Sequence, residues 1–244
     1  YVSNEKDHNM SVIDGDSLEV IKTVKVGHRP RGIILSKDKK KIIICTSDDN
    51  RIAVVDVASL EIDYYLPSGP DPELMVMDDS GKFIYVANED DNMVTVVDYV
   101  GKKIVKEIPV GVEPEGMGLS PDGKTLVNTS ETTNMAHFID TETLEIKANV
   151  LVDARPRVAQ YSADGKFVWV SSEIGGTISI IDSAKLQIIK KIEFSIPGLS
   201  KESIQPVGVR LDEKRQLAYV ALGPANRIAI INMKTYEVEK YILT

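Results

Sequence analysis

The chain has few of the residues that build covalent or metal-bound frameworks. Its 244 residues include one cysteine, Cys45, and three histidines. A single cysteine excludes an internal disulfide framework and a cysteine-based zinc cluster. Three histidines in the whole chain disfavour a multi-histidine metal centre. A lack of disulfides does not imply a reducing compartment, because many exported proteins have none.

Positive charge and long apolar runs are also scarce. Lys and Arg number 29 against 37 Asp and Glu, so the net charge is −8 and the pI is near 5.0. Nucleic acid as the main partner would need a concentrated basic field, so this class is disfavoured. No stretch approaches the ~18 consecutive apolar residues of a membrane helix, so no membrane span is expected. Phosphate-cradling glycine loops, G-x-S-x-G, H-E-x-x-H and EF-hand loops are missing too, so the sequence favours a protein that is not an enzyme.

What the sequence does contain is an internal repeat. An apolar-apolar-Asp signature ends at Asp14, Asp56, Asp98, Asp140 and Asp182, and a variant of it ends at Asn232. A proline marker recurs at Pro30, Pro72, Pro114, Pro156 and Pro206. Both markers advance by 42 residues at every step except the last, where the step is 50. Two unrelated markers with one period indicate tandem structural units. The longer last step indicates an insertion within residues 195–204, either a lid or docking element or a tolerated surface loop.

Each unit contains four short runs rich in Val, Ile and Tyr, separated by Gly, Pro, Asn and Asp. The runs in residues 82–98, 102–111 and 114–123 are representative. Four strands in 40–45 residues are typical of a β-propeller, so we predict an all-β propeller of four-stranded antiparallel blades. The chain represents six blades in a single domain, 1–244, and the first blade lacks its innermost strand. We expect a seven-bladed propeller that is truncated at its C-terminal end, with a closed six-bladed form as the alternative. Because the chain starts within a strand, we also expect that its natural beginning is missing.

The tandem YV-x-N and V-x-V-I-D units resemble the YVTN-family β-propellers. The less repetitive segments, above all NTSETTNMAHFID at residues 128–140, resemble the β-propellers associated with PQQ-dependent catabolism of alcohols. The resemblance extends over essentially the whole chain. It implies an exported, periplasmic protein that is encoded beside quinoprotein alcohol dehydrogenases and a transporter. Those dehydrogenases or transport components are therefore the suspected partners.

The residues on either side of the repeated proline form a first candidate site. They are Arg29 and Arg31, Asp71 and Glu73, Glu113 and Glu115, Arg155 and Arg157, and the neutral Gln205 and Val207. A repeat kept only for folding has little reason to vary charge at a fixed position, so this ring is a candidate for binding a ligand or a partner. Arginines grip carboxylates in bidentate fashion, and PQQ carries three, so PQQ is a candidate ligand. The structural alternative is a set of salt bridges between blades.

A second ring lies nine residues before each repeated Asp or Asn. Its members are Glu5, Ser47, Glu89, Glu131, Glu173 and Gly223. Glu89, Glu131 and Glu173 are weak candidates for a Ca²⁺ site, and the alternatives are hydrogen bonding within turns or pairing with the arginines of the first ring.

The fourth blade departs from the repeat at two positions. Asn128 stands where other blades have Val or Ile, and His137 stands where they have Ser, Ala or Thr. If Thr132 and Thr133 form the hairpin turn, Asn128 and His137 face each other across the strand pair. They either satisfy each other's hydrogen bonds or form a buried, proton-sensitive ligand contact. Trp169 and Cys45 are expected in the core.

These features leave several functions open. The leading one is a non-enzymatic accessory protein of quinoprotein alcohol oxidation, which binds a small anion or a partner protein at the charged loops. The alternatives are a lactonase-like hydrolase that uses a divalent metal, a propeller that carries haem with His137 as ligand, and a surface or adhesion protein of the YVTN type.

Overall fold

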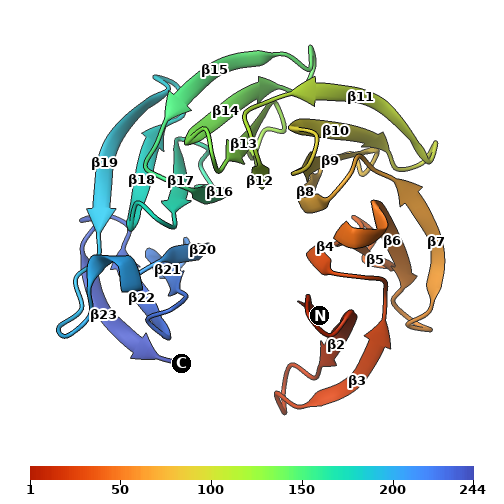
Figure 1. Ribbon diagram of the computed structural model, residues 1–244, viewed down its shortest axis with the longest axis horizontal. Coiled ribbons are helices and arrows are strands. Elements are labelled where there is room, and N and C mark those ends of the chain that lie inside the picture. Colours follow the sequence, from red (N-terminus) through yellow and green to blue (C-terminus); the bar gives the residue numbers. More distant parts are fainter. The chain divides into compact units, whose positions relative to one another are not determined.

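The computed structural model describes residues 1–244 as a succession of β-strands (Figure 1). Its only helical segments are two single 3-10 turns, η1 (Ser47–Asp49) and η2 (Lys201–Ser203). No helix has the length and apolar character needed to cross a membrane. The chain forms two compact units, residues 1–114 and 115–244.

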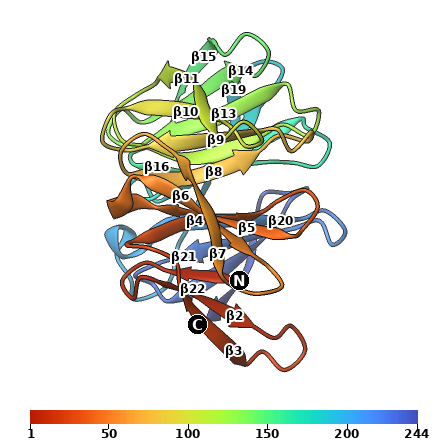
Figure 2. The ribbon, with the colours of Figure 1, turned by 90° about the vertical axis from the view of Figure 1, so that its right-hand side faces the viewer.

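The first unit contains three antiparallel sheets, coloured from red to yellow in Figure 1. The first sheet has three strands, β1 (Val2–Asn4), β2 (Asn9–Ile13) and β3 (Val20–Lys25). The second has β4 (Pro30–Leu35), β5 (Lys41–Thr46), β6 (Arg51–Asp56) and β7 (Ile62–Pro67). The third has β8 (Pro72–Met77), β9 (Phe83–Asn88), β10 (Met93–Asp98) and β11 (Lys103–Pro109). The innermost strands β4 and β8 lie side by side (Figure 2).

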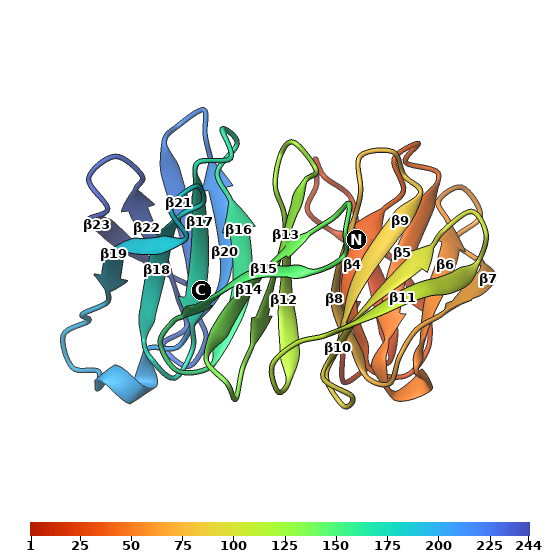
Figure 3. The same cartoon turned by 90° about the horizontal axis from the view of Figure 1, so that it is seen from above.

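The second unit contains three four-stranded sheets, coloured from green to blue. The first has β12 (Pro114–Leu119), β13 (Thr125–Ser130), β14 (Met135–Asp140) and β15 (Ile146–Leu151). The next has β16 (Pro156–Tyr161), β17 (Phe167–Ser172), β18 (Thr177–Asp182) and β19 (Gln187–Glu193). The last has β20 (Pro206–Asp212), β21 (Leu217–Leu222), β22 (Arg227–Asn232) and β23 (Val238–Leu243). Strands β16 and β20 are neighbours in this unit (Figure 3). The predicted all-β propeller of six blades, the first without its innermost strand, is confirmed.

The repeated Asp has a local structural cause. In the five four-stranded blades it ends the third strand, and in the first blade Asp14 directly follows β2. Its Oδ1 accepts hydrogen bonds from backbone N–H groups two and three residues later. Asp56 accepts from Ala58 and Ser59 at 3.0 Å each, and Asn232 does the same with Lys234 and Thr235. Short polar side chains favour such turns because they replace the backbone's own acceptors. The apolar-apolar-Asp signature therefore marks the outermost hairpin of every blade.

The repeated Pro also has a local role. It begins the innermost strand, and a β-bulge follows it directly, between Pro30 and Ile33, and at the equivalent places in β8, β16 and β20. A bulge inserts an unpaired residue and redirects the side chains beside it. The residue that follows each proline is therefore turned out of the regular sheet alternation.

Neighbouring sheets within each unit bury apolar faces against each other. Cys45 of β5 belongs to one such cluster and is fully buried, as expected. Trp169 of β17 is also buried, as expected, in a cluster shared by the last two sheets. The insertion at 195–204 is anchored by the buried side chains of Ile196 and Ile204, and residues 197–202 between them are mostly exposed.

Candidate functional site

The charged residue before each repeated proline has an unusual backbone conformation. Arg29, Asp71, Glu113 and Arg155 all have left-handed φ angles, of 49°, 47°, 58° and 57°. This region costs a side chain with a Cβ atom roughly 1–2 kcal/mol, so neighbouring contacts must hold it.

A residue of the preceding blade supplies one of these contacts. The backbone N–H of each left-handed residue donates to a side chain that lies 21 residues earlier. The pairs are Arg29 with His8 Nδ1, Asp71 with Asn50 Oδ1, Glu113 with Asn92 Oδ1, and Arg155 with Asn134 Oδ1, at 3.0–3.1 Å. The four accepting residues are themselves left-handed. The same pair of backbone and side-chain contacts, called the backbone clamp below, therefore holds an arginine in two blades and an acidic residue in the two blades between them.

The carbonyl group of the left-handed residue is held as well. Asp71 C=O accepts from Glu89 N–H at 3.0 Å, and Arg155 C=O accepts from Glu173 N–H at 2.8 Å. Ser47 N–H donates in the same way to Arg29 C=O at 3.1 Å, and Gly223 N–H donates to Gln205 C=O at 3.0 Å. These bonds bring the two rings of candidate residues together, with two pairs in each unit.

In the first unit, two arginines lie among four carboxylates, those of Glu5, Asp71, Glu73 and Glu89. Arg29 donates through Nη1 to Asp71 at 2.7 Å and through Nε to Glu5 at 3.2 Å. Its Nη2 lies 3.2 Å from Glu73. Arg31 donates to the fully buried Glu73 and, at 2.9 Å, to Glu5. Every one of these pairs joins neighbouring blades. These contacts are therefore salt bridges between blades, which the sequence left open as one of two interpretations.

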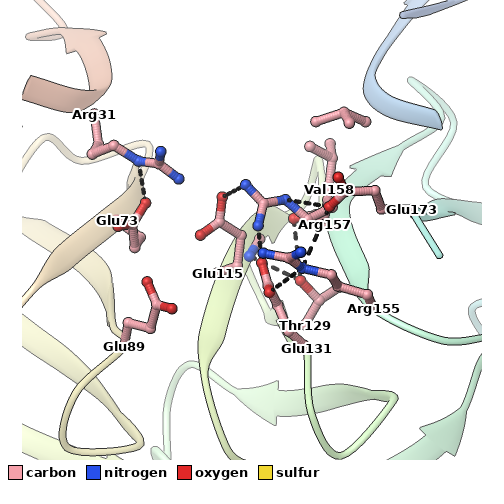
Figure 4. Close-up of polar contacts among 12 residues, drawn as sticks. Arg31, Glu73, Glu89, Glu115, Thr129, Glu131, Arg155, Arg157, Val158 and Glu173 are labelled. Atoms are coloured by element: carbon pink, nitrogen blue, oxygen red, sulfur yellow. Dashed lines mark hydrogen bonds and ion pairs between the residues drawn. The ribbon is translucent and has the colours of Figure 1, made fainter. Parts of the chain in front are cut away.

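In the second unit, two arginines lie among three carboxylates (Figure 4). Arg157 contacts Glu131 and lies 3.0 Å from Glu115. Arg155 donates to Glu131 at 2.7 Å and lies 3.4 Å from Glu173. The two arginines differ in exposure, because the Arg157 side chain is 15% exposed and the Arg155 side chain is 46% exposed.

These contacts shift the pKa values of Glu5 and Arg29. Burial raises the pKa of Glu5, but the charges and hydrogen bonds of Arg31 and Arg29 outweigh it and hold the pKa below its ordinary value. Burial lowers the pKa of Arg29, but Asp71, Glu73 and Glu5 together raise it above its ordinary value. Glu5 and Arg29 are therefore charged near neutral pH. Carboxyl groups outnumber arginines in both clusters, so the formal charge of each cluster is negative.

The carboxylates of Asp71, Glu73 and Glu89 converge, with oxygens within 4.8 Å of one another, as in a metal site. The guanidinium of Arg29 lies against all three, at 2.7 Å from Asp71, 3.2 Å from Glu73 and 4.0 Å from Glu89. It supplies the positive charge that a cation would bring. Glu131 and Glu173, the other proposed Ca²⁺ ligands, likewise contact Arg155 and Arg157. A hard cation at either place would have to displace these arginine contacts.

Asn128 and His137 are paired across β13 and β14, as predicted from the hairpin. Ser130 links the two side chains, because its Oγ lies 3.5 Å from Asn128 Oδ1 and 3.1 Å from His137 Nε2. His137 Nδ1 lies 2.6 Å from Asn149 Oδ1, an acceptor, so Nδ1 carries the proton. Burial lowers the pKa of His137, and the bond to Asn149 only partly opposes this. The ring is therefore neutral and bonded through both nitrogens.

The clamp residues His8, Asn50, Asn92 and Asn134 were not predicted as part of the site. A signal for them exists in the sequence, since these positions follow one another at 42 residues and three of the four are asparagine. Asparagine tolerates the left-handed region and offers an acceptor.

Comparisons with known proteins agree with the propeller fold. The family described as Cytochrome D1 heme domain matches residues 38–155, slightly less than half of the chain. No curated protein matches this chain. A solved structure of hydrazine synthase from Kuenenia stuttgartiensis is similar, with a TM-score of 0.90 and 20% sequence identity. The similarity covers 99% of this chain and 82% of that one. At this identity the similarity concerns the fold, so this chain is similar in architecture to one chain of that enzyme.

Proposed function

We propose that this chain is a non-catalytic binding propeller whose charged loops recognise a partner protein. One observation carries the proposal: a constant backbone clamp holds residues of different charge at the same position in successive blades. A framework that stays constant while its side chains vary is the arrangement found where loops on a rigid fold carry recognition.

The two residues around each proline have different roles in this proposal. Arg31, Glu73, Glu115 and Arg157, which follow the proline, are largely buried and join blades. Arg29 and Arg155, which precede it, keep 30% and 46% of their side chains exposed. Asp71 also precedes a proline, but its side chain is only 15% exposed. The partner therefore contacts mainly Arg29 and Arg155.

A partner protein is favoured over a small anion such as PQQ. To bind the three carboxylates of PQQ, the arginines would have to release the carboxylates that they already contact. These are Glu5, Asp71, Glu131 and Glu173. An anion would also approach a cluster with a net negative charge. A protein surface that presents both basic and acidic groups complements such a cluster better.

The identity of the partner rests on the resemblance to propellers associated with PQQ-dependent catabolism. A quinoprotein alcohol dehydrogenase, or a component of its transport system, is the partner proposed, and the periplasm is the proposed location.

Calorimetric titration tests this directly. A purified quinoprotein alcohol dehydrogenase and free PQQ are titrated separately into the chain. We expect micromolar binding of the dehydrogenase and no heat from PQQ. Micromolar binding of PQQ that is lost in Arg155→Ala would contradict the proposal and indicate a cofactor-handling protein. No heat from either titrant would contradict it as well.

The match to the Cytochrome D1 heme domain family raises haem binding as a second candidate function. His137 does not fit the role of haem ligand, because both of its ring nitrogens are hydrogen-bonded and the residue is 5% exposed. An absorption spectrum recorded during titration with haemin tests this. A spectrum of axially ligated haem that is lost in His137→Ser would support haem binding by His137.

A further inference from the structure

The second unit contains a cavity that none of the features above uses. It has a volume of about 430 Å³ and lies between the turns that follow β16, β20 and β22. Its lining includes Asp164, Phe167, Trp169, Glu213, Met233 and Tyr236. Arg155 precedes β16 and Asp164 follows it, so the cavity and the ionic cluster lie at opposite ends of one strand, about 20 Å apart. A volume of this size is typical of small-molecule sites.

The cavity is lined by residues that depart from the repeat. Tyr236 stands where four other blades have leucine, at Leu18, Leu60, Leu144 and Leu186. Trp169, the only tryptophan, stands where other blades have Tyr, Ile or Val. The two rings contact each other, with centroids 5.8 Å apart and planes inclined by 49°. A repeat kept for folding alone does not explain why these exceptions meet at one cavity.

The polar lining is acidic. Glu213 accepts a hydrogen bond from the backbone N–H of Ala163 at 2.8 Å, which holds its carboxylate across the mouth of the cavity. The carboxylate of Asp164 accepts from Ser162 Oγ at 2.7 Å and from Lys166 N–H at 3.1 Å. These hydrogen bonds lower the pKa of Asp164 to about 2, so it is ionised at neutral pH. Lys166 Nζ also lies 3.0 Å from Asp164, but both side chains are at least half exposed, and such pairs contribute little. No lysine or arginine lines the cavity.

We propose that this cavity binds a small organic cation, an amine with an apolar body. The faces of aromatic rings attract ammonium groups, and carboxylates attract them further. The rings of Phe167 and Tyr236 and the Met233 side chain would contact the apolar body, while Glu213 and Asp164 would pair with the ammonium group. This inference is independent of the proposed partner binding, because it concerns the opposite end of the strands.

Binding can be measured by tryptophan fluorescence, because Trp169 is the only tryptophan of the chain and it lines the cavity. Three probes of similar size are titrated into the full chain: 2-phenylethylamine, the neutral 2-phenylethanol and the anionic 3-phenylpropanoate. We expect a saturable fluorescence change with the amine, and binding at least about tenfold weaker with the alcohol and the acid. Equal affinity for amine and alcohol, or no saturable change up to 10 mM amine (roughly the weak limit of specific binding), would overturn the proposal.

Two variants locate the site. Glu213→Gln keeps the acceptor for Ala163 but removes the charge, and Tyr236→Leu restores the residue found in four other blades, so both are expected to fold. We expect each to weaken amine binding by about tenfold. Glu61→Gln, at an exposed carboxylate of the first unit, is the matched control and should leave binding unchanged. Calorimetry repeats the titrations independently of the tryptophan. Unchanged affinity in both variants would contradict the proposed site.

Discussion

The backbone N–H of Arg155 donates to Asn134 Oδ1 at 3.1 Å, and both residues adopt left-handed backbone conformations. The bond joins the β13–β14 turn of one blade to the loop that begins the next. It places the Arg155 side chain beside Glu131 of the same turn, 2.7 Å from Nε to Oε2. One asparagine thus sets both the backbone and the electrostatic surroundings of an arginine in another blade.

Replacing Asn134 by glycine tests this clamp. Glycine adopts the left-handed conformation without strain but offers no acceptor, and Gly176 already occupies the equivalent position one blade later. We expect Asn134→Gly to lower the free energy of unfolding by about 1 kcal/mol and to speed hydrogen exchange at the Arg155 amide. Urea denaturation and exchange measured by NMR check this. An unchanged exchange rate at Arg155 would show that the bond does not hold the loop.

The two arginines around Pro156 should differ in their effect on stability. Arg157→Ala leaves the buried carboxylates of Glu115 and Glu131 without the guanidinium between them, so we expect a loss of about 3 kcal/mol or more. Arg155 is far more exposed, and Arg155→Ala should cost less than about 1 kcal/mol. Urea denaturation of both variants provides the comparison. Equal losses of stability would contradict the idea that Arg157 holds the fold together while Arg155 is available to a partner.

Gly116 allows β12 to approach β16 closely. A Cβ atom at this position would lie 2.3 Å from the backbone oxygen of Arg157. Gly116→Ala must therefore displace backbone, and we expect a loss of about 1–3 kcal/mol. Gly15→Ala is the matched control, because a Cβ atom there meets nothing within 4 Å. Thermal unfolding of the two variants distinguishes them, and an equally stable Gly116→Ala protein would be inconsistent with this packing.

Stability should fall on mild acidification because of His137. Its pKa in the folded state lies below the ordinary value of 6.5, so the unfolded chain binds the proton more tightly. The free energy of unfolding therefore decreases as the pH falls below about 6.5, until the pKa of the folded state is passed. Glu5 acts in a lower window, because its lowered pKa stabilises the fold above about 4.5 and this contribution is lost below that pH.

Replacement of His137 by serine, the residue at the same position in two other blades, isolates the histidine contribution. We expect His137→Ser to reduce the slope of unfolding free energy against pH just below pH 6.5. Urea denaturation at a series of pH values measures the slope. An identical slope in the variant and the parent would mean that His137 does not titrate on unfolding in this range.

The sequence predicted the strands and blades well because two local devices mark every repeat. The Asp56 turn and the Pro30 bulge each depend on a few neighbouring residues, so their period is visible along the chain. The pairing of Asn128 with His137 was also accessible, because the hairpin register fixes which residues face each other.

The contacts of the charged residues could not be predicted from the sequence as well. Arg29 reaches Asp71 in the next blade and Glu5 in the preceding one, and sequence spacing alone does not distinguish these contacts from an exposed, ligand-ready arginine. The interposition of Ser130 between Asn128 and His137 depends on side-chain conformation, which the register leaves open. The acidic aromatic cavity brings together three turns that are up to about 70 residues apart, so no local pattern predicts it.

A binding measurement shows whether the loops display charge to a protein partner. A quinoprotein alcohol dehydrogenase is immobilised, and its affinity is measured by interferometry for the parent chain, Arg29→Ala, Arg155→Ala and the control Lys190→Ala, which removes an exposed positive charge from β19. We expect each arginine variant to bind at least about tenfold more weakly and the control to bind as the parent does. Equal affinity in all four proteins, or no binding by the parent, would show that these loops do not recognise the dehydrogenase.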